Sequence, residues 1–236
     1  MHVLQLSDIH FTATGRHVDG RDADARLATV LDACLQADAG PDLVVVTGDL
    51  TDDGTTAACR RLRDALAPLE VPILAVPGNH DVPAVVSETF PTNVATAGGW
   101  RIVGIDTSRD GQIHGRVDVA GELRRLDAWD RRPTLLAMHH PPLSPSRNAW
   151  FQLDGAADLL AALTSRPQVK GIVSGHLHHP FSLRSEAGTP VLGCPSTLIA
   201  FRHDGEELVV GGSDATGARW LHLTDAGTLT STVLTA

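Results

Sequence analysis

Several features that mark exported, membrane-spanning or nucleic-acid-binding proteins are absent from this chain. Its three cysteines are odd in number and widely spaced, which excludes a disulfide framework and a thiolate zinc site and favours reduced, buried thiols. No apolar run approaches the roughly 20 residues that a membrane span requires, so we expect no membrane partner. A strand-like run begins at His2 and leaves no room for an export signal, so we expect a soluble cytoplasmic protein.

Positive charge is also scarce. The formal net charge is −9, with 19 Lys and Arg against 28 Asp and Glu, and no basic stripe runs along the sequence. Nucleic-acid-binding surfaces cluster Lys and Arg against the phosphates, so we do not expect a nucleic acid polymer as a partner. Bound divalent cations would still place positive charge inside one cleft, and a small anion could be drawn there.

The sequence contains an alternation of strand and helix signals. Short apolar runs rich in β-branched residues predict strands over Val3–Leu6, Leu43–Val46, Ile73–Val76, Ile102–Ile105, Leu135–Met138 and Val169–Val173. Apolar residues at helical spacing predict helices over Asp22–Ala37, Ala57–Leu66 and Val119–Trp129. The alternation indicates an α/β core.

The pattern changes after Gly175. Short runs punctuated by glycine predict consecutive antiparallel strands that complete a second sheet, over Phe181–Arg184, Pro190–Leu192, Leu208–Val210, Arg219–Leu223 and Leu229–Leu234. We find no linker, repeat or low-complexity segment. The sequence therefore predicts a single α/β domain over residues 1–236, built as a two-layer mixed β sandwich flanked by helices.

Metal-type side chains fall in five clusters, four of which directly follow a predicted strand. The clusters are Asp8-x-His10, Gly48-Asp49, Gly78-Asn79-His80-Asp81, His139-His140-Pro141 and Gly175-His176-Leu177-His178. Loops from several strands converge beyond the carboxyl ends of the strands of an α/β sheet, so distant clusters can meet there. Adjacent His139 and His140 cannot both point to the same side, and we take His139 as the ligand.

The spacing within the clusters indicates how each could serve a metal. Asp8 and His10 are two residues apart, so their side chains project to the same side if the strand continues, and His176 and His178 repeat this spacing. A carboxylate has two faces, so Asp49 could bridge two cations.

The Gly78–Asp81 cluster is more specific than a turn requires. Asn79 offers a neutral oxygen ligand, His80 can donate a proton, and Asp81 can orient the His80 ring.

Together, the five motifs resemble the calcineurin-like metallophosphoesterase superfamily over residues 8 to 178. Two stretches, Gly48–Gly54 and Met138–Leu143, are similar to its bacterial branch of class III cyclic-nucleotide phosphodiesterases and glycerophosphodiesterases. A weaker likeness to the cyclic AMP phosphodiesterase tail lies in Pro195-Ser-Thr197, Phe201, Arg219-Trp-Leu221 and Gly227-x-Leu229.

The resemblance implies an αββα metallophosphoesterase fold and two metal ions, manganese, iron or zinc. Asp49 would bridge them, with one metal on Asp8, His10 and His178 and the other on Asn79, His139 and His176. Asn79 and His80 would face the substrate. A hydroxide between the cations would attack phosphorus, while His80, its ring held by Asp81, would protonate the leaving group.

The leading hypothesis is a phosphodiesterase acting on 3′,5′-cyclic nucleotides such as cyclic AMP. The same residues would serve a broader enzyme acting on glycerophosphodiesters, 2′,3′-cyclic nucleotides or phosphomonoesters. A nucleotide-binding regulatory module without turnover is the non-enzyme alternative. Self-association into a homodimer stays open.

Two segments stay open as substrate contacts. The chain has no tyrosine, so Trp150 and Phe151 are the candidates for a nucleobase wall, or else they pack under their loop. The charged loop from Arg16 to Arg21 either lines the substrate mouth or is simply solvated.

Overall fold

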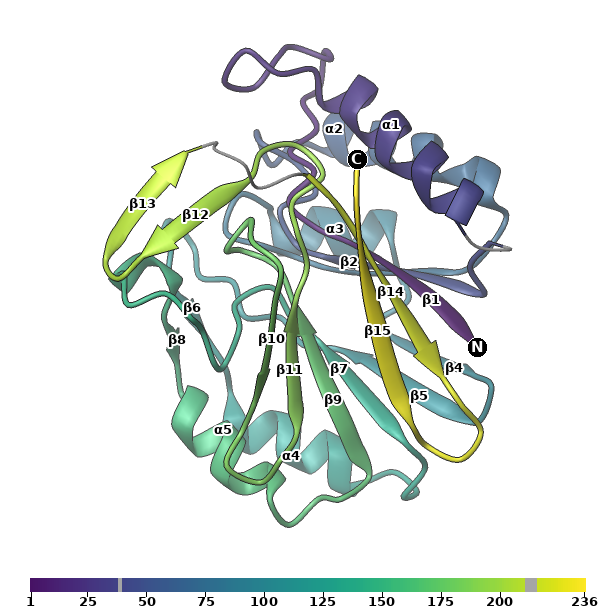
Figure 1. The fold of residues 1–236 in the computed structure, drawn as a ribbon, viewed down its shortest axis with the longest axis vertical. Helices are drawn as coiled ribbons and strands as arrows, with labels where there is room; N and C mark the ends of the chain where they lie inside the picture. The colour runs from purple at the N-terminus through teal and green to yellow at the C-terminus, as the bar shows by residue number, and fades with distance from the viewer. Residues whose placement is uncertain (38–39, 211–215) are drawn as a thin grey trace.

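The strands of this chain form two stacked sheets with helices on the outer faces (Figure 1). The computed structural model describes residues 1–37, 40–210 and 216–236. The strand order is β15-β14-β1-β2-β3 in the first sheet and β10-β11-β9-β7-β5-β4 in the second.

The first sheet is parallel at its centre. It consists of β1 (His2–Leu6), β2 (Leu43–Thr47), β3 (Ile73–Val76), β14 (Gly217–Leu223) and β15 (Leu229–Thr235). Strands β1, β2 and β3 run parallel, while β14 is antiparallel to β1 and β15 to β14. Its outer face carries α1 (Ala23–Ala37), α2 (Thr56–Leu66), the 3-10 turn η1 (Ala67–Leu69) and α3 (Pro83–Thr89).

The second sheet has four parallel strands between two antiparallel edges. It consists of β4 (Val94–Ala97), β5 (Trp100–Gly104), β7 (Thr134–Ala137), β9 (Val169–Ser174), β10 (Phe181–Arg184) and β11 (Pro190–Gly193). Helices α4 (Val119–Asp127) and α5 (Ala156–Leu163) cover its outer face. Two small ribbons join β6 (Gly115–Arg116) to β8 (Leu153–Asp154) and β12 (Phe201–Asp204) to β13 (Glu207–Val210).

Alternate residues of each central strand enter different apolar layers. Val3 and Val45 pack between the sheets together with Trp100. Leu4 and Val44 face the helices instead. Because both faces of these strands are covered, their sequences are nearly continuous apolar runs.

The structure confirms the α/β sandwich and corrects the expected placement of the tail. Strands β10 and β11 complete the second sheet, as the sequence predicts, but β13 pairs with β12 in a separate hairpin. Strands β14 and β15 return to the first sheet and pair beside β1. Strand β11 is also parallel to β9 rather than antiparallel. Among the residues that the structure describes, no helix has the length and apolarity needed to cross a membrane.

Candidate metal centre

The five clusters meet at one end of the two sheets. Asp8, Asp49 and Asn79 follow the parallel strands β1, β2 and β3. His139 and His176 follow β7 and β9, which are parallel to each other in the second sheet. The carboxyl ends of strands from both sheets therefore deliver all the predicted ligands to one place.

The backbone at this place is strained. Seven non-glycine residues of the described chain have a positive φ, and five of them belong to the clusters: Asp8, His10, Asp49, His176 and His178. Such conformations cost free energy and concentrate at functional sites. They also correct the expectation that extended backbone aligns the i and i+2 side chains, because left-handed turns at the strand ends direct these side chains instead.

Gly48 shows why the backbone must come close to the ligands. Its φ is +88°, and a Cβ atom at this position would overlap the ring of His139. A side chain at position 48 would therefore displace a predicted ligand, and glycine meets both the conformational and the spatial requirement.

Four predicted ligands form the first group of the site. Asp8, His10, Asp49 and His178 are all buried, and each offers a ligand atom within 4.8 Å of the others. His178 Nε2 lies 3.4 Å from Asp8 Oδ1 and 3.4 Å from His10 Nε2. The four side chains therefore converge on one point.

The second group continues across Asp49. His139 Nε2 is 3.1 Å from Asn79 Oδ1 and 3.5 Å from Asp49 Oδ2, and its ring centroid is 4.8 Å from that of His176. Asp49 Oδ2 is also 3.8 Å from His10 Nε2. One carboxylate oxygen thus lies between the two groups.

His140 points elsewhere, although its ring is near His139 and His176. Its Nδ1 is 2.8 Å from Thr107 Oγ1, and its Nε2 donates to the Ile113 carbonyl at 2.9 Å. Both ring nitrogens are therefore occupied within the protein.

Three of the predicted histidine ligands donate one ring N–H to a backbone carbonyl. The bonds are His139 Nδ1 to Thr47, His176 Nε2 to Trp150 and His178 Nδ1 to Ile199, at 2.8, 2.9 and 2.9 Å. A carbonyl can only accept, so these nitrogens carry the protons. In the neutral ring the other nitrogen keeps its lone pair, which is how metal-ligating histidines are oriented in proteins.

Burial and neighbouring charges set the protonation of the group. Burial raises the pKa of Asp8 to about 6. Burial opposes ionisation of Asp49 too, but His139 and His10 outweigh it and hold the Asp49 pKa well below its usual value. Burial lowers the pKa of His139, but the Asp49 carboxylate outweighs this effect and raises the pKa to about 9. Burial keeps the pKa of His176 and that of His178 well below the ordinary value, so both rings are neutral.

The positions and the chemistry of these donor atoms fit a pair of cations. The His10 and His178 Nε2 atoms face each other at 3.4 Å beside the Asp8 carboxylate, whereas His10 Nδ1 faces Asp52 and leaves Nε2 for a cation. Buried ionised carboxylates are costly unless they are paired or bind a cation. Mixed carboxylate, amide and imidazole donors suit borderline metals such as manganese, iron and zinc without selecting one.

Asp81 does not hold the His80 ring, which corrects the sequence-based expectation. Its carboxylate accepts four hydrogen bonds, from the amides of Leu50, Thr51 and Gly78 and from the Thr51 hydroxyl, at 2.8 to 3.0 Å. Asp81 therefore fixes the loop after β2 to the loop after β3.

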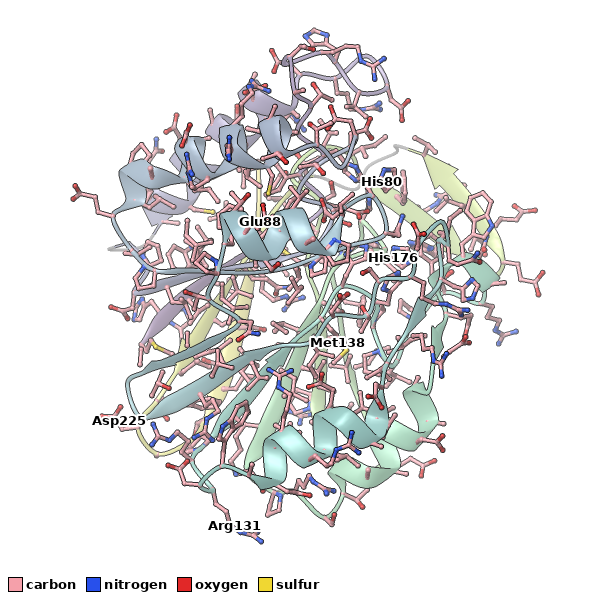
Figure 2. The ribbon with its side chains drawn as sticks, turned by 180° about the vertical axis from the view of Figure 1, so that it is seen from behind. His80, Glu88, Arg131, Met138, His176 and Asp225 are labelled. Atoms are coloured by element: carbon pink, nitrogen blue, oxygen red, sulfur yellow. The ribbon has the colours of Figure 1, made fainter. Side chains whose placement is uncertain are left out.

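Asp52 faces His80 instead. Its Oδ1 is 3.7 Å from His80 Nδ1 and 3.6 Å from His10 Nδ1. Sequence reasoning gave Asp52 no role, although it lies three residues after Asp49 in the same strand-end loop. In Figure 2, His80 and His176 lie near one another, on the side of the molecule that carries the β12–β13 hairpin.

A pocket of about 230 Å³ opens over the two groups. Its polar floor is made by His10, Asp49, Asp52, Asn79, His80, His176 and His178. Its wall includes Ile113 and Trp150, which are 44% and 53% exposed. Phe151 also borders the pocket but is buried, with its ring edge against His176, so it packs under the loop.

Only part of the charged loop reaches this pocket. Val18 and Asp19 line it, whereas Arg16, His17 and Arg21 are not among its lining residues.

Comparisons with known proteins agree with one another. Residues 1–180 match the family model described as calcineurin-like phosphoesterase. The chain is 32% identical to a "probable cyclic nucleotide phosphodiesterase" of Synechococcus sp., covering 89% of this chain and 85% of that protein. It is 30% identical to the 3′,5′-cyclic adenosine monophosphate phosphodiesterase CpdA of Pseudomonas aeruginosa, covering 96% and 87%.

Solved structures show the same fold at lower identity. A dimetal phosphatase from Danio rerio superposes with a TM-score of 0.67 and 14% identity, covering 94% of this chain and 92% of that chain. A protein of Thermus thermophilus superposes with a TM-score of 0.58, covering 98% of each chain.

Proposed function

The chain belongs to the calcineurin-like phosphoesterase family, and on this basis we propose that it is a metal-dependent phosphodiesterase acting on 3′,5′-cyclic nucleotides, cyclic AMP among them. The names of the similar proteins support this substrate class. The observation that carries the proposal is the position of Asp49, whose Oδ2 lies within 4 Å of both His10 and His139.

In this proposal two groups of ligands share Asp49. Asp8, His10 and His178 would hold one cation together with Asp49, and Asn79, His139 and His176 would hold the other. Bound there, two cations of manganese, iron or zinc would neutralise the phosphoryl oxygens and supply a nucleophile at neutral pH. The carbonyls that fix the histidine rings keep the donor atoms directed to the centre.

His80 is the proposed proton donor for the leaving alkoxide. Its side chain is 41% exposed and lines the pocket, so it can reach a substrate that the buried ligands hold from below. The Asp52 carboxylate faces its Nδ1 at 3.7 Å, which leaves Nε2 directed to the pocket. Asn79, the preceding residue, also lies on the pocket floor, where it would face the phosphate of the substrate.

The apolar wall of the pocket suits the base of a nucleotide. Trp150 and Ile113 are exposed at the pocket and offer a flat ring and an aliphatic side chain. Aromatic side chains stack on any nucleobase with little sequence preference. We therefore assign the base to this wall and the phosphate to the floor.

The whole chain is proposed to act as one domain in the cytoplasm. Strand β14 pairs with β1 along its length, so the end of the chain completes the sheet that carries Asp8 and Asp49. All three cysteines are buried and unpaired, as expected in a reducing compartment.

The test is metal-dependent formation of AMP from cyclic AMP. Metal-free protein would be loaded with Mn²⁺, Fe²⁺ or Zn²⁺, and product followed by chromatography. Asp49→Ala should abolish product, while Asp225→Ala, an exposed carboxylate far from the site in Figure 2, should leave it unchanged.

The same assay separates the alternatives. Equal kcat/KM on 2′,3′-cyclic AMP, a glycerophosphodiester or p-nitrophenyl phosphate would replace the cyclic-nucleotide assignment with a broad specificity. Tight binding of cyclic AMP without turnover under any metal would overturn the proposed activity.

A further inference from the structure

The ring of His176 is held by a short segment that no metal motif includes. This segment is the 3-10 turn η2 (Ala149–Phe151), which Asn148 precedes. We propose that Asn148 is a positioning residue, which fixes the Trp150 carbonyl and through it directs the ring of His176 to the centre. The inference rests on the proposed metal-binding role of His176.

The first step is the cap of the turn. The side-chain oxygen of Asn148 accepts a hydrogen bond from the Trp150 amide at 2.9 Å, and the Asn148 backbone is extended, as at a helix N-cap. This bond fixes the peptide units of η2, and with them the direction of the Trp150 carbonyl.

The second step joins the turn to the ligand. His176 Nε2 donates to the Trp150 carbonyl at 2.9 Å, so Nδ1 is the nitrogen left for a cation. The ring of Phe151 meets that of His176 edge-on, with centroids 5.1 Å apart. The main chain of residue 150 and the side chain of residue 151 therefore hold the ring from two directions.

The third step ties the turn to the β12–β13 hairpin. The Asn148 side-chain amide donates to the Glu206 carbonyl at 2.9 Å, and the Arg147 amide donates to the Gly205 carbonyl at 3.0 Å. The hairpin returns to the site through His203, whose Nε2 donates to the Leu177 carbonyl at 2.8 Å. The turn, the hairpin and the loop that carries His176 are therefore joined by one network of hydrogen bonds.

An asparagine meets both requirements of this position. Its oxygen caps the turn while its amide donates to the hairpin, and aspartate would keep the accepting oxygen but lose the donor. The two substitutions Asn148→Asp and Asn148→Ala therefore separate the cap from the tether.

The test is a titration of metal-free protein with Mn²⁺, followed by calorimetry and by the electron paramagnetic resonance of free Mn²⁺. We expect the wild type to bind two ions, and Asn148→Ala to weaken one of them by about 10- to 100-fold while the other is unchanged. Asn148→Asp should restore the weakened site to within about threefold, since both residues are good N-caps. Gln36→Ala, an exposed amide on α1, is the control and should bind as the wild type does.

The outcomes are distinct. Unchanged affinity of both ions in Asn148→Ala, or an equal loss at both, overturns the inference and leaves the proposed function standing. The same holds if Asn148→Asp binds as weakly as Asn148→Ala. If Asn148→Ala does not fold, Asn148→Asp decides alone, since weakening of one site beyond about threefold contradicts the role of the cap. A wild type that binds no Mn²⁺, Fe²⁺ or Zn²⁺ overturns the proposed function and the inference together.

Discussion

The carboxylate of Asp52 faces the ring of His80, with Oδ1 3.7 Å from Nδ1. The Asp52 carbonyl is 3.5 Å from the same nitrogen. The carbonyl accepts a hydrogen bond from Nδ1, and the carboxylate faces the same nitrogen, so the proton is placed on Nδ1 and Nε2 is the nitrogen that faces the pocket. The loop after β2 therefore contributes twice to the site, through Asp49 on the floor and through Asp52 behind His80.

His80→Ala should lower kcat on cyclic AMP by about 10²- to 10⁴-fold, the usual contribution of a positioned proton donor. The decrease in kcat of this variant on bis-p-nitrophenyl phosphate should be much smaller, because the p-nitrophenolate leaves without a proton. Steady-state kinetics on both substrates, with Mn²⁺ affinity measured alongside, tests this. Equal losses on the two substrates would remove His80 from the role of acid.

Asp52→Asn should also lower kcat more on cyclic AMP than on bis-p-nitrophenyl phosphate, but by a smaller factor than His80→Ala. The amide keeps the shape of the carboxylate but removes the negative charge that faces the His80 ring during proton transfer, so we expect about a tenfold loss of kcat on cyclic AMP. Asp53→Asn is the control, since the adjacent carboxylate caps Thr55 and Ala13 instead of facing His80. If both variants behave alike, the pairing of Asp52 with His80 has no catalytic consequence.

Trp150→Ala should raise KM for cyclic AMP by about 5- to 100-fold, equivalent to the loss of one base-stacking contact. The Trp150 carbonyl remains in this variant, so Mn²⁺ affinity should not change. Ribose 3′,5′-cyclic phosphate, which lacks a base, serves as the control substrate. A comparable rise in its KM would assign the ring of Trp150 to the loop rather than to the base.

Sequence reasoning succeeded where local pattern decides the structure. Strands β1, β2 and β3 are apolar on both faces, and the spacing of Leu27, Val30 and Cys34 defines the buried face of α1. It did not reveal α5, since Ala156–Leu163 is apolar almost throughout and shows no helical contrast. The return of β14 to β1 depends on pairing such as Leu4 with Trp220, which no local pattern encodes.

The candidate site could also be predicted only in part from the sequence. Residue types in the five motifs predicted which side chains would meet, because strand ends converge. Their conformation was not predictable, since the positive φ of Asp8 and His10 arises from the loops packed around them. Adjacency along the chain also suggested Asp81 as the partner of His80, whereas the turn at Gly78 directs Asp81 toward Leu50 and Thr51 and leaves Asp52 to face the ring.

Arg219→Ala should lower the free energy of unfolding by about 3 kcal/mol. Arg219 is 1% exposed, and its guanidinium joins the sheets by donating to the carbonyls of Phe181 and Gly193 at 2.8 to 3.2 Å. Its loss removes charged hydrogen bonds to two buried carbonyls, at about 1.5 to 3 kcal/mol each. Urea denaturation measures the change, and Arg184→Ala, exposed on β10, should stay within about 0.5 kcal/mol. Equal effects would mean that Arg219 adds no more than a surface arginine.

Metal affinity should rise with pH between 7 and 9. The pKa of His139 is raised to about 9 by Asp49, so at pH 7 the metal-free protein holds a proton that a cation must displace. Binding at this site should therefore strengthen about tenfold per pH unit up to pH 9 and then level off. Metal affinity should fall further below pH 6, because Asp8 takes up a proton there. Calorimetry under argon in buffers of different ionisation enthalpy counts the protons released, and a Mn²⁺ affinity that is flat from pH 7 to 9 would mean that His139 is already neutral.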